Sequence, residues 1–381
     1  MVASGLSSNE IYCLNLKGLT PNDIVIGNSV YALGILGGLK SGMKSFFGGE
    51  MVSYTELFAE GRKLATERMI SEGEKIGAQG ITGVDSSLIF HPENIEFLSI
   101  GSGVNSSNSI KFFSSSSSGQ ELYSQIDANY IPTKFVFGNV AYSIGAMKNF
   151  TGGFKSFVKG EVKQFTDIFV KTRNLALERI INESKDSGAN AIVGIKTMIL
   201  SMNYEIEVEE MLMTGTASYN SNLPIECNSN PVTTNLSAEE IWNITKLGYI
   251  PQKLVIGTSI YSLGVVGNFA SILRSFVKGE ISQLTQLIYE ARQSSIQKIK
   301  DEAIEIGADE VINIKTYVNS IGGTLIEFLA IGTAVKKDPK AVTFSENIIP
   351  QAVTQNRETF FSYAPDNYGF NANKGKAQPI N

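Results

Sequence analysis

Apolar and small residues recur at every third or fourth position over the stretch that follows Glu280. They are Ile281, Leu284, Ile288, Ala291, Ser295, Ile299, Ala303 and Ile306. This spacing places them on one face of a helix and predicts one long amphipathic helix. Glu280 in its first turn complements the positive end of the helix, and Gly307 just beyond can adopt the left-handed conformation that ends it.

Apolar runs on both sides of this helix predict strands. The stretch 254–263 is rich in Val, Ile and Tyr and is bounded by proline and glycine. After the helix, 311–318 and 324–335 have the same β-favouring character, and the turn residues 319–323 join them. Such runs flanked by turn residues are typical of strands. The predicted order is strand, helix, strand, strand.

The same pattern occurs three times along the chain. The segment 21–27, which begins with proline and ends with glycine, recurs at 132–138 and at 251–257. Polar residues follow at matching positions in each copy: Tyr31, Tyr142 and Tyr261; Ser45, Ser156 and Ser275; Glu50, Glu161 and Glu280; Arg62, Arg173 and Arg292. A further glutamate recurs near the end of each copy, as Glu96, Glu210 and Glu327. Self-similarity of this kind indicates a repeat architecture.

Each copy is preceded by a capping box, in which a serine is followed three residues later by a glutamate. The pairs are Ser7 with Glu10, Ser118 with Glu121 and Ser237 with Glu240. The serine oxygen accepts one unpaired amide at a helix start, and the glutamate reaches back to another. A short leading helix is therefore predicted in every copy.

The sequence thus predicts an α+β protein of three tandem β-α-β-β repeats, each with a short leading helix, whose sheets associate between units. The predicted segments are unit 1 at 7–104, a linker at 105–117, unit 2 at 118–218, a linker at 219–236, unit 3 at 237–337 and a tail at 338–381. Serine and asparagine dominate the linkers, and the tail is polar. Such segments bury too little apolar surface to offset their ordering entropy, so we expect flexible tethers. Phe360, Phe361 and Tyr363 leave a partner-binding tail as the alternative.

Composition and charge narrow the class of protein. The chain has 381 residues, 43% of them hydrophobic, and a net charge of -5. An acidic balance disfavours nucleic acid as a partner. No stretch has the roughly 18 apolar residues that a membrane span needs, and the first residues do not resemble a signal peptide. Two separated cysteines, Cys13 and Cys227, favour a reducing compartment. We therefore expect a cytoplasmic protein without a membrane or nucleic-acid partner.

Several motifs resemble the bacterial YbjQ-like family, which is described as putative heavy-metal-binding. They are the segment 27–31, the helix after Glu50, the pair Gly77 and Ala78, and the ending 331–335. Unit 1 departs from the pattern at Gln79 and at 101–103. The resemblance implies a small α+β fold whose strands close a ring between subunits, commonly a pentamer. It implies no established activity.

The residue types and their spacing give little support for a metal site or a catalytic site. Soft and borderline metals take Cys and His ligands at defined spacings, whereas the one histidine, His91, has no counterpart in the other copies. The glycine-rich stretch 34–41 has Leu39 where a phosphate-binding loop requires glycine, although its amides could still meet an anion. We expect no cofactor and no catalytic residue.

The recurring tyrosine, serine, glutamate and arginine are the candidate site residues. They can stabilise the contacts between units, or they can surround a small ligand there. Recurrence within one chain does not distinguish these two roles, because a duplicated interface and a duplicated ligand site repeat the same residues. Because exposed strand edges must be covered, we expect self-association through sheets, with the arginines near the seams. The leading hypothesis is a non-enzymatic oligomeric scaffold or binding module. The alternative is a small-molecule or metal-ion sensor with its ligand between units, followed distantly by an enzyme.

Overall fold

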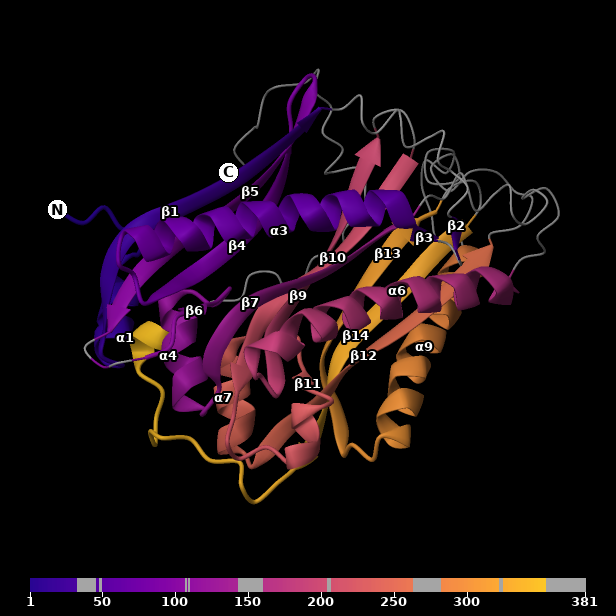
Figure 1. The fold of residues 1–381 in the computed structure, drawn as a ribbon. Coiled ribbons are helices and arrows are strands. Elements are labelled where there is room, and N and C mark those ends of the chain that lie inside the picture. The colour runs from indigo at the N-terminus through magenta and orange to yellow at the C-terminus, as the bar shows by residue number, and fades with distance from the viewer. Residues whose placement is uncertain are drawn as a thin grey trace.

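The structure is a computed structural model, and three similar units follow one another along it (Figure 1). It describes residues 1–32, 46–47, 50–106, 108, 110–142, 160–203, 207–262, 282–321 and 325–353. Each unit contains a short helix, a long strand, a long helix and a two-stranded hairpin, in that order. The predicted β-α-β-β order with a leading helix is confirmed.

The elements of the three units match one another closely in length. Unit 1 contains α1 (Ser8–Asn15), β1 (Leu19–Ala32), α3 (Val52–Lys75), β4 (Gly80–Phe90) and β5 (Asn94–Ser106). Unit 2 contains α4 (Gly119–Asp127), β7 (Ile131–Tyr142), α6 (Lys163–Ser184), β9 (Ala191–Asn203) and β10 (Glu207–Tyr219). Unit 3 contains α7 (Ala238–Lys246), β12 (Tyr249–Ser262), α9 (Ser282–Glu305), β13 (Glu310–Ser320) and β14 (Leu325–Lys337).

Each unit builds one sheet in which the last strand lies in the middle. In unit 1 the order is β1-β5-β4, and the same order recurs as β7-β10-β9 and β12-β14-β13. All of these pairs are antiparallel. Units 1 and 2 each also contribute a short strand to the sheet of the following unit. β3 (Glu50–Met51) pairs with β7, and β8 (Gly160–Glu161) pairs with β12. The units are therefore linked through strand edges.

All three leading helices begin with the predicted capping box. The Ser7 hydroxyl accepts the Glu10 amide at 3.3 Å, and the Glu10 carboxylate accepts the Ser7 amide at 2.8 Å. The boxes at Ser118 and Ser237 have both hydrogen bonds as well. The three leading helices lie beside one another, with α4 in contact with both α1 and α7.

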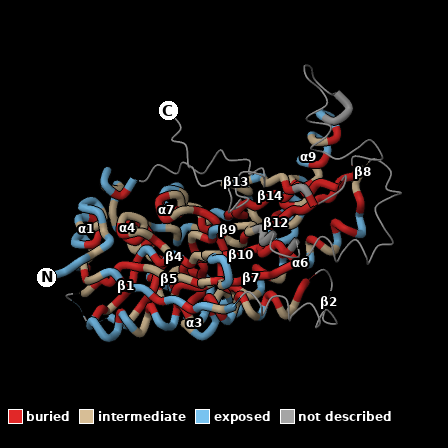
Figure 2. The backbone as a smooth tube through the Cα atoms, turned by 90° about the horizontal axis from the view of Figure 1, so that it is seen from above, coloured by how far each residue is buried: buried red, intermediate tan, exposed pale blue. Residues whose placement is uncertain are grey.

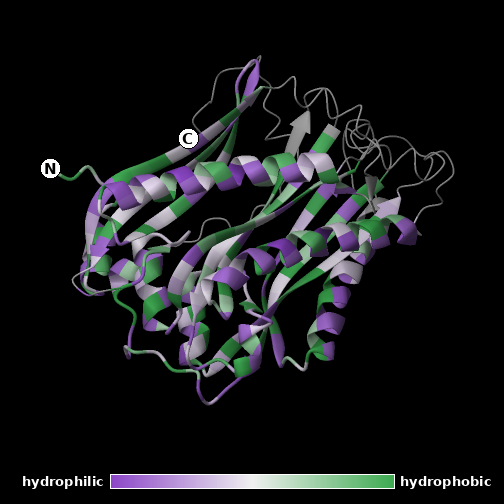
Figure 3. Cartoon of the chain, viewed as in Figure 1, coloured by the Kyte–Doolittle hydropathy of each residue, from purple (hydrophilic) through white to green (hydrophobic). Residues whose placement is uncertain are grey.

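The long helix lies unusually close to the first strand of its own unit. A Cβ atom added at Gly138 would stand 2.3 Å from the carbonyl oxygen of Ala176 and 2.4 Å from the amide of Ile180. Gly27 and Gly257 meet the helices α3 and α9 in the same way. Only glycine permits this approach, which explains the glycine that ends the repeated segment. Along α3, hydrophilic and hydrophobic residues alternate as one face is buried (Figure 3).

The two linkers differ from the flexible tethers that their composition predicted. In 105–117, β6 (Phe113–Ser114) pairs in parallel with β4, and in 219–236, β11 (Val232–Thr233) pairs in parallel with β9. The Ser114 hydroxyl accepts the Phe135 amide of the next unit at 2.9 Å, and the Thr233 hydroxyl accepts the Leu254 amide at 2.9 Å. Hydrogen bonds to small polar side chains therefore stabilise the ordered conformation of these segments. The prediction of flexibility considered only the burial of apolar surface.

The first part of the tail is also packed, contrary to the expectation of flexibility. Residues 338–353 run back past α7 and α4 to α1 (Figure 1). The Phe344 amide donates to the carbonyl oxygen of Asp127, and Ala352 is buried against Cys13 and Tyr123. Residues 354–381, with Phe360, Phe361 and Tyr363, lie outside the described residues. In the part of the chain that is described, no helix combines the length and hydropathy of a membrane span.

Candidate functional site at the seams between units

Two seams join the units. We call the contact of α3 with β7 and β10 the first seam, and that of α6 with β12 and β14 the second seam. At the first, Arg62 on α3 reaches Glu210 on β10, with 2.8 Å between Nη2 and Oε2. Neither side chain has any exposed surface. Arg62 also donates to the carbonyl oxygen and the hydroxyl of Ser86 in its own unit.

The second seam repeats this ion pair with the next arginine and glutamate. Arg173 donates to Glu327 through Nε at 3.0 Å and through Nη2 at 2.7 Å, which is the bidentate geometry that guanidinium and carboxylate favour. The guanidinium also lies over the Tyr142 ring, 4.6 Å from its centroid. Both charged side chains are fully buried here too.

The electrostatics of the second seam hold its groups in one protonation state. Burial alone would lower the pKa of Arg173, but the Glu327 charge and the interactions with Tyr142 together outweigh burial and raise the pKa above the ordinary value. Burial also raises the pKa of Tyr142 well above its usual range, which keeps the phenol neutral. That phenol donates to Glu209 and accepts from Arg173. Arg173 therefore stays charged and Tyr142 stays neutral near neutral pH, and both act as fixed hydrogen-bonding partners.

A threonine on α3 and one on α6 each add a hydrogen bond to the backbone of the following unit. The Thr55 hydroxyl accepts the Ala141 amide at 2.9 Å, and the Thr166 hydroxyl accepts the Ile260 amide at 3.0 Å. Both threonines are buried. These residues were missed in the sequence, although a threonine stands five residues after Glu50, Glu161 and Glu280 in every copy.

The recurring glutamate before the long helix belongs to the seams and does not lie in the helix. Glu50 is in β3, and α3 starts two residues later at Val52, so in unit 1 this glutamate precedes the helix. The first-turn position predicted for Glu280 lies outside the described residues. Glu50 lies 2.7 Å from Arg179 of unit 2. Glu161 in β8 lies 2.9 Å from Lys298 of unit 3. Each carboxylate thus pairs with a cation on the long helix of the next unit.

The recurring tyrosines pack as core aromatics. The rings of Tyr31 and Phe97 meet edge to face at 5.8 Å, and those of Tyr261 and Phe328 do so at 6.4 Å. Burial raises the pKa of Tyr31 and of Tyr261, with Glu60 and Glu161 adding to the respective shifts. The geometry therefore fits the structural interpretation of these residues.

The third arginine and several candidate residues stand apart from the two seams. Arg292 on α9 is exposed, and no unit packs against it among the described residues. Its expected place near a seam between units is therefore not found within the chain. The candidates Ser45, Ser156, Ser275 and Glu280 lie outside the described residues.

Metal-ligating residues do not come together in the described part of the chain. No group of three or more His, Cys, Asp or Glu side chains there is arranged to hold an ion. His91 Nε2 lies 2.8 Å from Glu96 Oε2, on an exposed hairpin. Burial raises the pKa of both Cys13 and Cys227, which disfavours the thiolate that binds metals. Within the described ranges, the residues do not fit a heavy-metal site.

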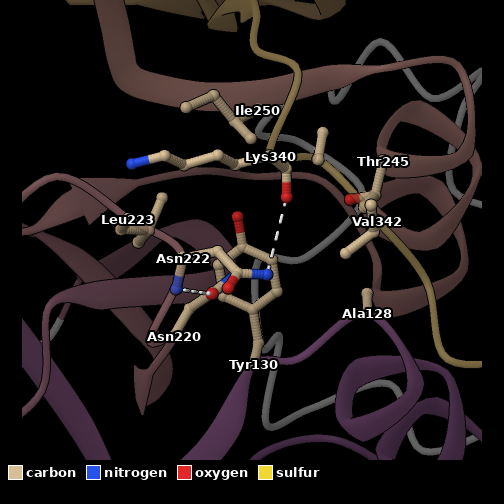
Figure 4. Close-up of a pocket in the computed structure, with 10 residues that line it drawn as sticks. Ala128, Tyr130, Asn220, Asn222, Leu223, Thr245, Ile250, Lys340 and Val342 are labelled. Carbon is tan, nitrogen blue, oxygen red and sulfur yellow. Dashed lines mark hydrogen bonds between the residues drawn. The ribbon is translucent and has the colours of Figure 1, made fainter.

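A small pocket between unit 2, α7 and the tail has room for about one water molecule (Figure 4). Its volume is about 10 Å³, and its lining includes Tyr130, Thr245 and Lys340. The Asn222 side-chain amide closes one side by donating to the carbonyl oxygen of Lys340. The Thr245 hydroxyl has no hydrogen-bond partner among the described protein atoms, so a bound water would satisfy it. The pocket is too small for a nucleotide or a flavin.

Comparison with known proteins gives a consistent assignment. A family model described as putative heavy-metal-binding matches three times, at residues 18–103, 125–220 and 244–338. An encapsulin nanocompartment protein of Mycobacterium tuberculosis is 30% identical over 226 residues, which cover 56% of this chain and 84% of that protein. Two archaeal UPF0145 proteins match single units. The one from Saccharolobus islandicus is 37% identical over 22% of this chain and 73% of its own length, and the one from Thermoplasma acidophilum is 35% identical over 23% and 79%. Neither the family description nor these names state an enzymatic activity.

Proposed function

The chain belongs to the YbjQ family, as three tandem copies of its domain, and we propose that it is a non-enzymatic oligomeric scaffold or binding module. In this proposal the recurring polar residues hold units together and process no substrate. The observation that carries it is the use of the same side chains at both seams: Arg62 with Glu210, and Arg173 with Glu327.

The chemistry of these residues supports a structural role. A catalytic acid or base needs a pKa near the working pH and access to a substrate. Arg173 and Tyr142 are fully buried, and both have a raised pKa, so neither offers a proton at neutral pH. The buried ion pairs instead fix the register between units, a use for which buried polar groups are best attested.

Self-association of whole chains is part of the proposal. A relative is named an encapsulin nanocompartment protein, which links that protein to a large assembly. The outer strand of unit 1, β1, stands at the edge of its sheet, and such an edge is open to pairing. We place the assembly in the cytoplasm, because Cys13 and Cys227 belong to different clusters and are unpaired.

A sensor for a metal ion or small molecule is the second candidate, and the family description favours it. Isothermal titration of the full chain with zinc, copper, nucleotides and flavins separates the two functions. Light scattering at micromolar concentration gives the mass in the same samples. A multiple of 41.3 kDa without ligand heat supports the scaffold. Stoichiometric binding supports the sensor, and a monomer mass removes self-association.

A further inference from the structure

Equivalent residues of the three units differ sharply in burial on one face of the first strand. On β7 and β12, the residues Ala141 and Ile260 lie on the sheet face turned away from the long helix of their own unit. Neither has any exposed surface. Their counterpart on β1, Val30, is 56% exposed, and Ile26 is 48% exposed where its counterpart Ile256 is 9% exposed. Buried and exposed residues alternate along β1, whereas β12 is buried almost throughout (Figure 2). The same sheet face is thus open in unit 1 and covered in the other two.

The preceding unit is what covers this face in units 2 and 3. Ala141 packs with Met51, Tyr54 and Phe58 of unit 1. Ile260 packs in one cluster with Val162 and other residues of unit 2. In addition, β3 and β8 pair with the outer edges of β7 and β12, whereas among the described residues no strand pairs with the outer edge of β1. Unit 1 therefore presents an apolar face that the preceding unit covers in the other two, and a strand edge with which a short strand pairs there.

The opposite end of the chain carries the complementary half of a seam. On α9, Thr285 and Arg292 are exposed, although their counterparts on the other long helices are all buried. Those counterparts are Thr55 and Arg62 on α3, and Thr166 and Arg173 on α6. Tyr289, between the two, is 62% exposed. This face of α9 has no unit to meet within the chain.

Glu96 of unit 1 already occupies the position that an incoming arginine requires. Along the paired strands, Val30 faces Glu96 in the same register in which Ala141 faces Glu210 and Ile260 faces Glu327. The Asn28 amide donates to Glu96 Oε1 at 2.9 Å, as the Asn139 amide donates to Glu210 Oε1 at 3.0 Å. Hydrogen bonds from Asn28 and His91 also lower the pKa of Glu96, which keeps it charged.

We propose that α9 of one chain docks on the open β1 and β5 face of a second copy of this chain. In this third seam, Arg292 pairs with Glu96 of the second copy, and the Thr285 hydroxyl accepts the Val30 amide of that copy. The inference rests on the proposed function, because it names the surfaces through which the scaffold assembles. Charge complementarity and continuity with the two seams inside the chain both support a second copy as the occupant.

The proposal is tested by charge reversal in the full chain, with mass measured by light scattering across micromolar concentrations. Arg292→Glu or Glu96→Arg alone should weaken association at least about 100-fold, because each places like charges in a desolvated contact. The double variant, Arg292→Glu with Glu96→Arg, should restore the wild-type mass. Lys63→Glu, which reverses an exposed cation on α3, is the matched control and should leave the mass unchanged.

The outcomes separate this seam from the broader function. Because Arg292 and Glu96 are exposed or partly exposed, unchanged circular dichroism should show that the variants fold. If the oligomer keeps its mass in both single charge-reversal variants, the third seam is contradicted. The proposed scaffold function is not contradicted by that result. A wild-type chain that stays at 41.3 kDa contradicts self-association itself. Thr285→Val provides an uncharged check, since it should weaken association without altering net charge.

Discussion

Arg173 and Glu327 are 154 residues apart in sequence and form a bidentate ion pair from which solvent is wholly excluded. The pair connects α6 of unit 2 to the central strand of unit 3. Such a pair gains little net stability over an apolar contact of the same shape, but it tolerates no wrong partner. The same pair recurs as Arg62 and Glu210, and in the proposed function this repetition sets the register in which the three units stack.

Removal of one member of this pair should be costly. Arg173→Ala leaves Glu327 buried without its counter-charge, so we expect the free energy of unfolding to fall by about 3 to 5 kcal/mol. Urea denaturation measures the change. Arg173→Met combined with Glu327→Leu should recover most of the loss. Lys63→Ala, at an exposed pair, should cost no more than about 0.5 kcal/mol. A small loss in Arg173→Ala would contradict a buried seam.

The seam threonines should contribute less, but in a way that depends on their position. Thr166→Val removes the acceptor of the buried Ile260 amide, and we expect a loss of about 1 to 3 kcal/mol in unfolding free energy. Thr285→Val changes an exposed residue, so its effect on the dilute monomer should stay within about 0.5 kcal/mol. Equal effects in the two variants would show that the threonines act locally within their helices.

Glu239 should make stability depend on pH. Burial, reinforced by the charges of Glu121 and Glu240, raises the pKa of this α7 carboxyl to about 7. A raised carboxyl pKa stabilises the folded state fully below the unfolded value of 4.5 and loses this contribution as pH rises through 7. Glu239→Gln should therefore increase stability at pH 8 by up to about 3 kcal/mol and flatten the fall between these two pKa values.

Thermal unfolding at several pH values measures the Glu239 effect. Glu67→Gln, at an exposed position on α3, is the control and should leave the pH profile unchanged. Asp127 acts in the opposite direction. Its pKa is lowered in spite of burial, because Lys17, Trp242 and Ser345 donate to it, so its contribution is lost at acid pH. A Glu239→Gln profile that matches wild type would show that this carboxyl is solvated.

Tight metal binding is not expected, whatever the family description. His91 and the two cysteines lie in different clusters or on the surface, and the described residues provide no set of three ligands. After dialysis without chelator, zinc and copper measured by mass spectrometry should be well below one ion per chain. Stoichiometric metal that disappears in His91→Ala or Cys13→Ala would overturn this prediction.

The local structure was predictable because its signals lie close together in sequence. The three-residue spacing of Ser7 and Glu10 is enough to predict a helix start. The helical periodicity of Ile288, Ala291 and Ser295 likewise predicts α9. These features depend on backbone geometry within one turn or a few turns. The order of elements in each unit followed from them.

The partners across the seams could not be read in the same way. Recurrence marked Arg62 and Glu96 equally, yet Arg62 pairs with Glu210 of the next unit and not with Glu96 of its own. The burial of a repeated residue also depends on which unit carries it: Arg292 in unit 3 is exposed, whereas Arg173 in unit 2 is buried. Such long-range pairing is a property of how units stack, which one copy of the pattern does not contain.

The linkers show a second limit of composition. Serines suggested a tether at 105–117, but Ser114 and Ser115 are buried and hydrogen-bonded. Their small size permits close packing, and their hydroxyls satisfy amides of the neighbouring unit. A polar segment can therefore be ordered when its hydrogen bonds are made by a partner far away in sequence.

A disulfide trap can show whether the contact repeated within the chain also joins one chain to another. In a background with Cys13→Ser and Cys227→Ser, Thr166→Cys with Ile260→Cys is the control within one chain. An equal mixture of Thr285→Cys chains and Val30→Cys chains is the test, because these are the matching positions at the two ends. Disulfides form only between backbones within about 7 Å, so the trap reports geometry. We expect a disulfide-linked dimer in the oxidised mixture, seen by electrophoresis without reductant, and none from either variant alone. If the control disulfide forms while the mixture stays monomeric, the third seam does not exist.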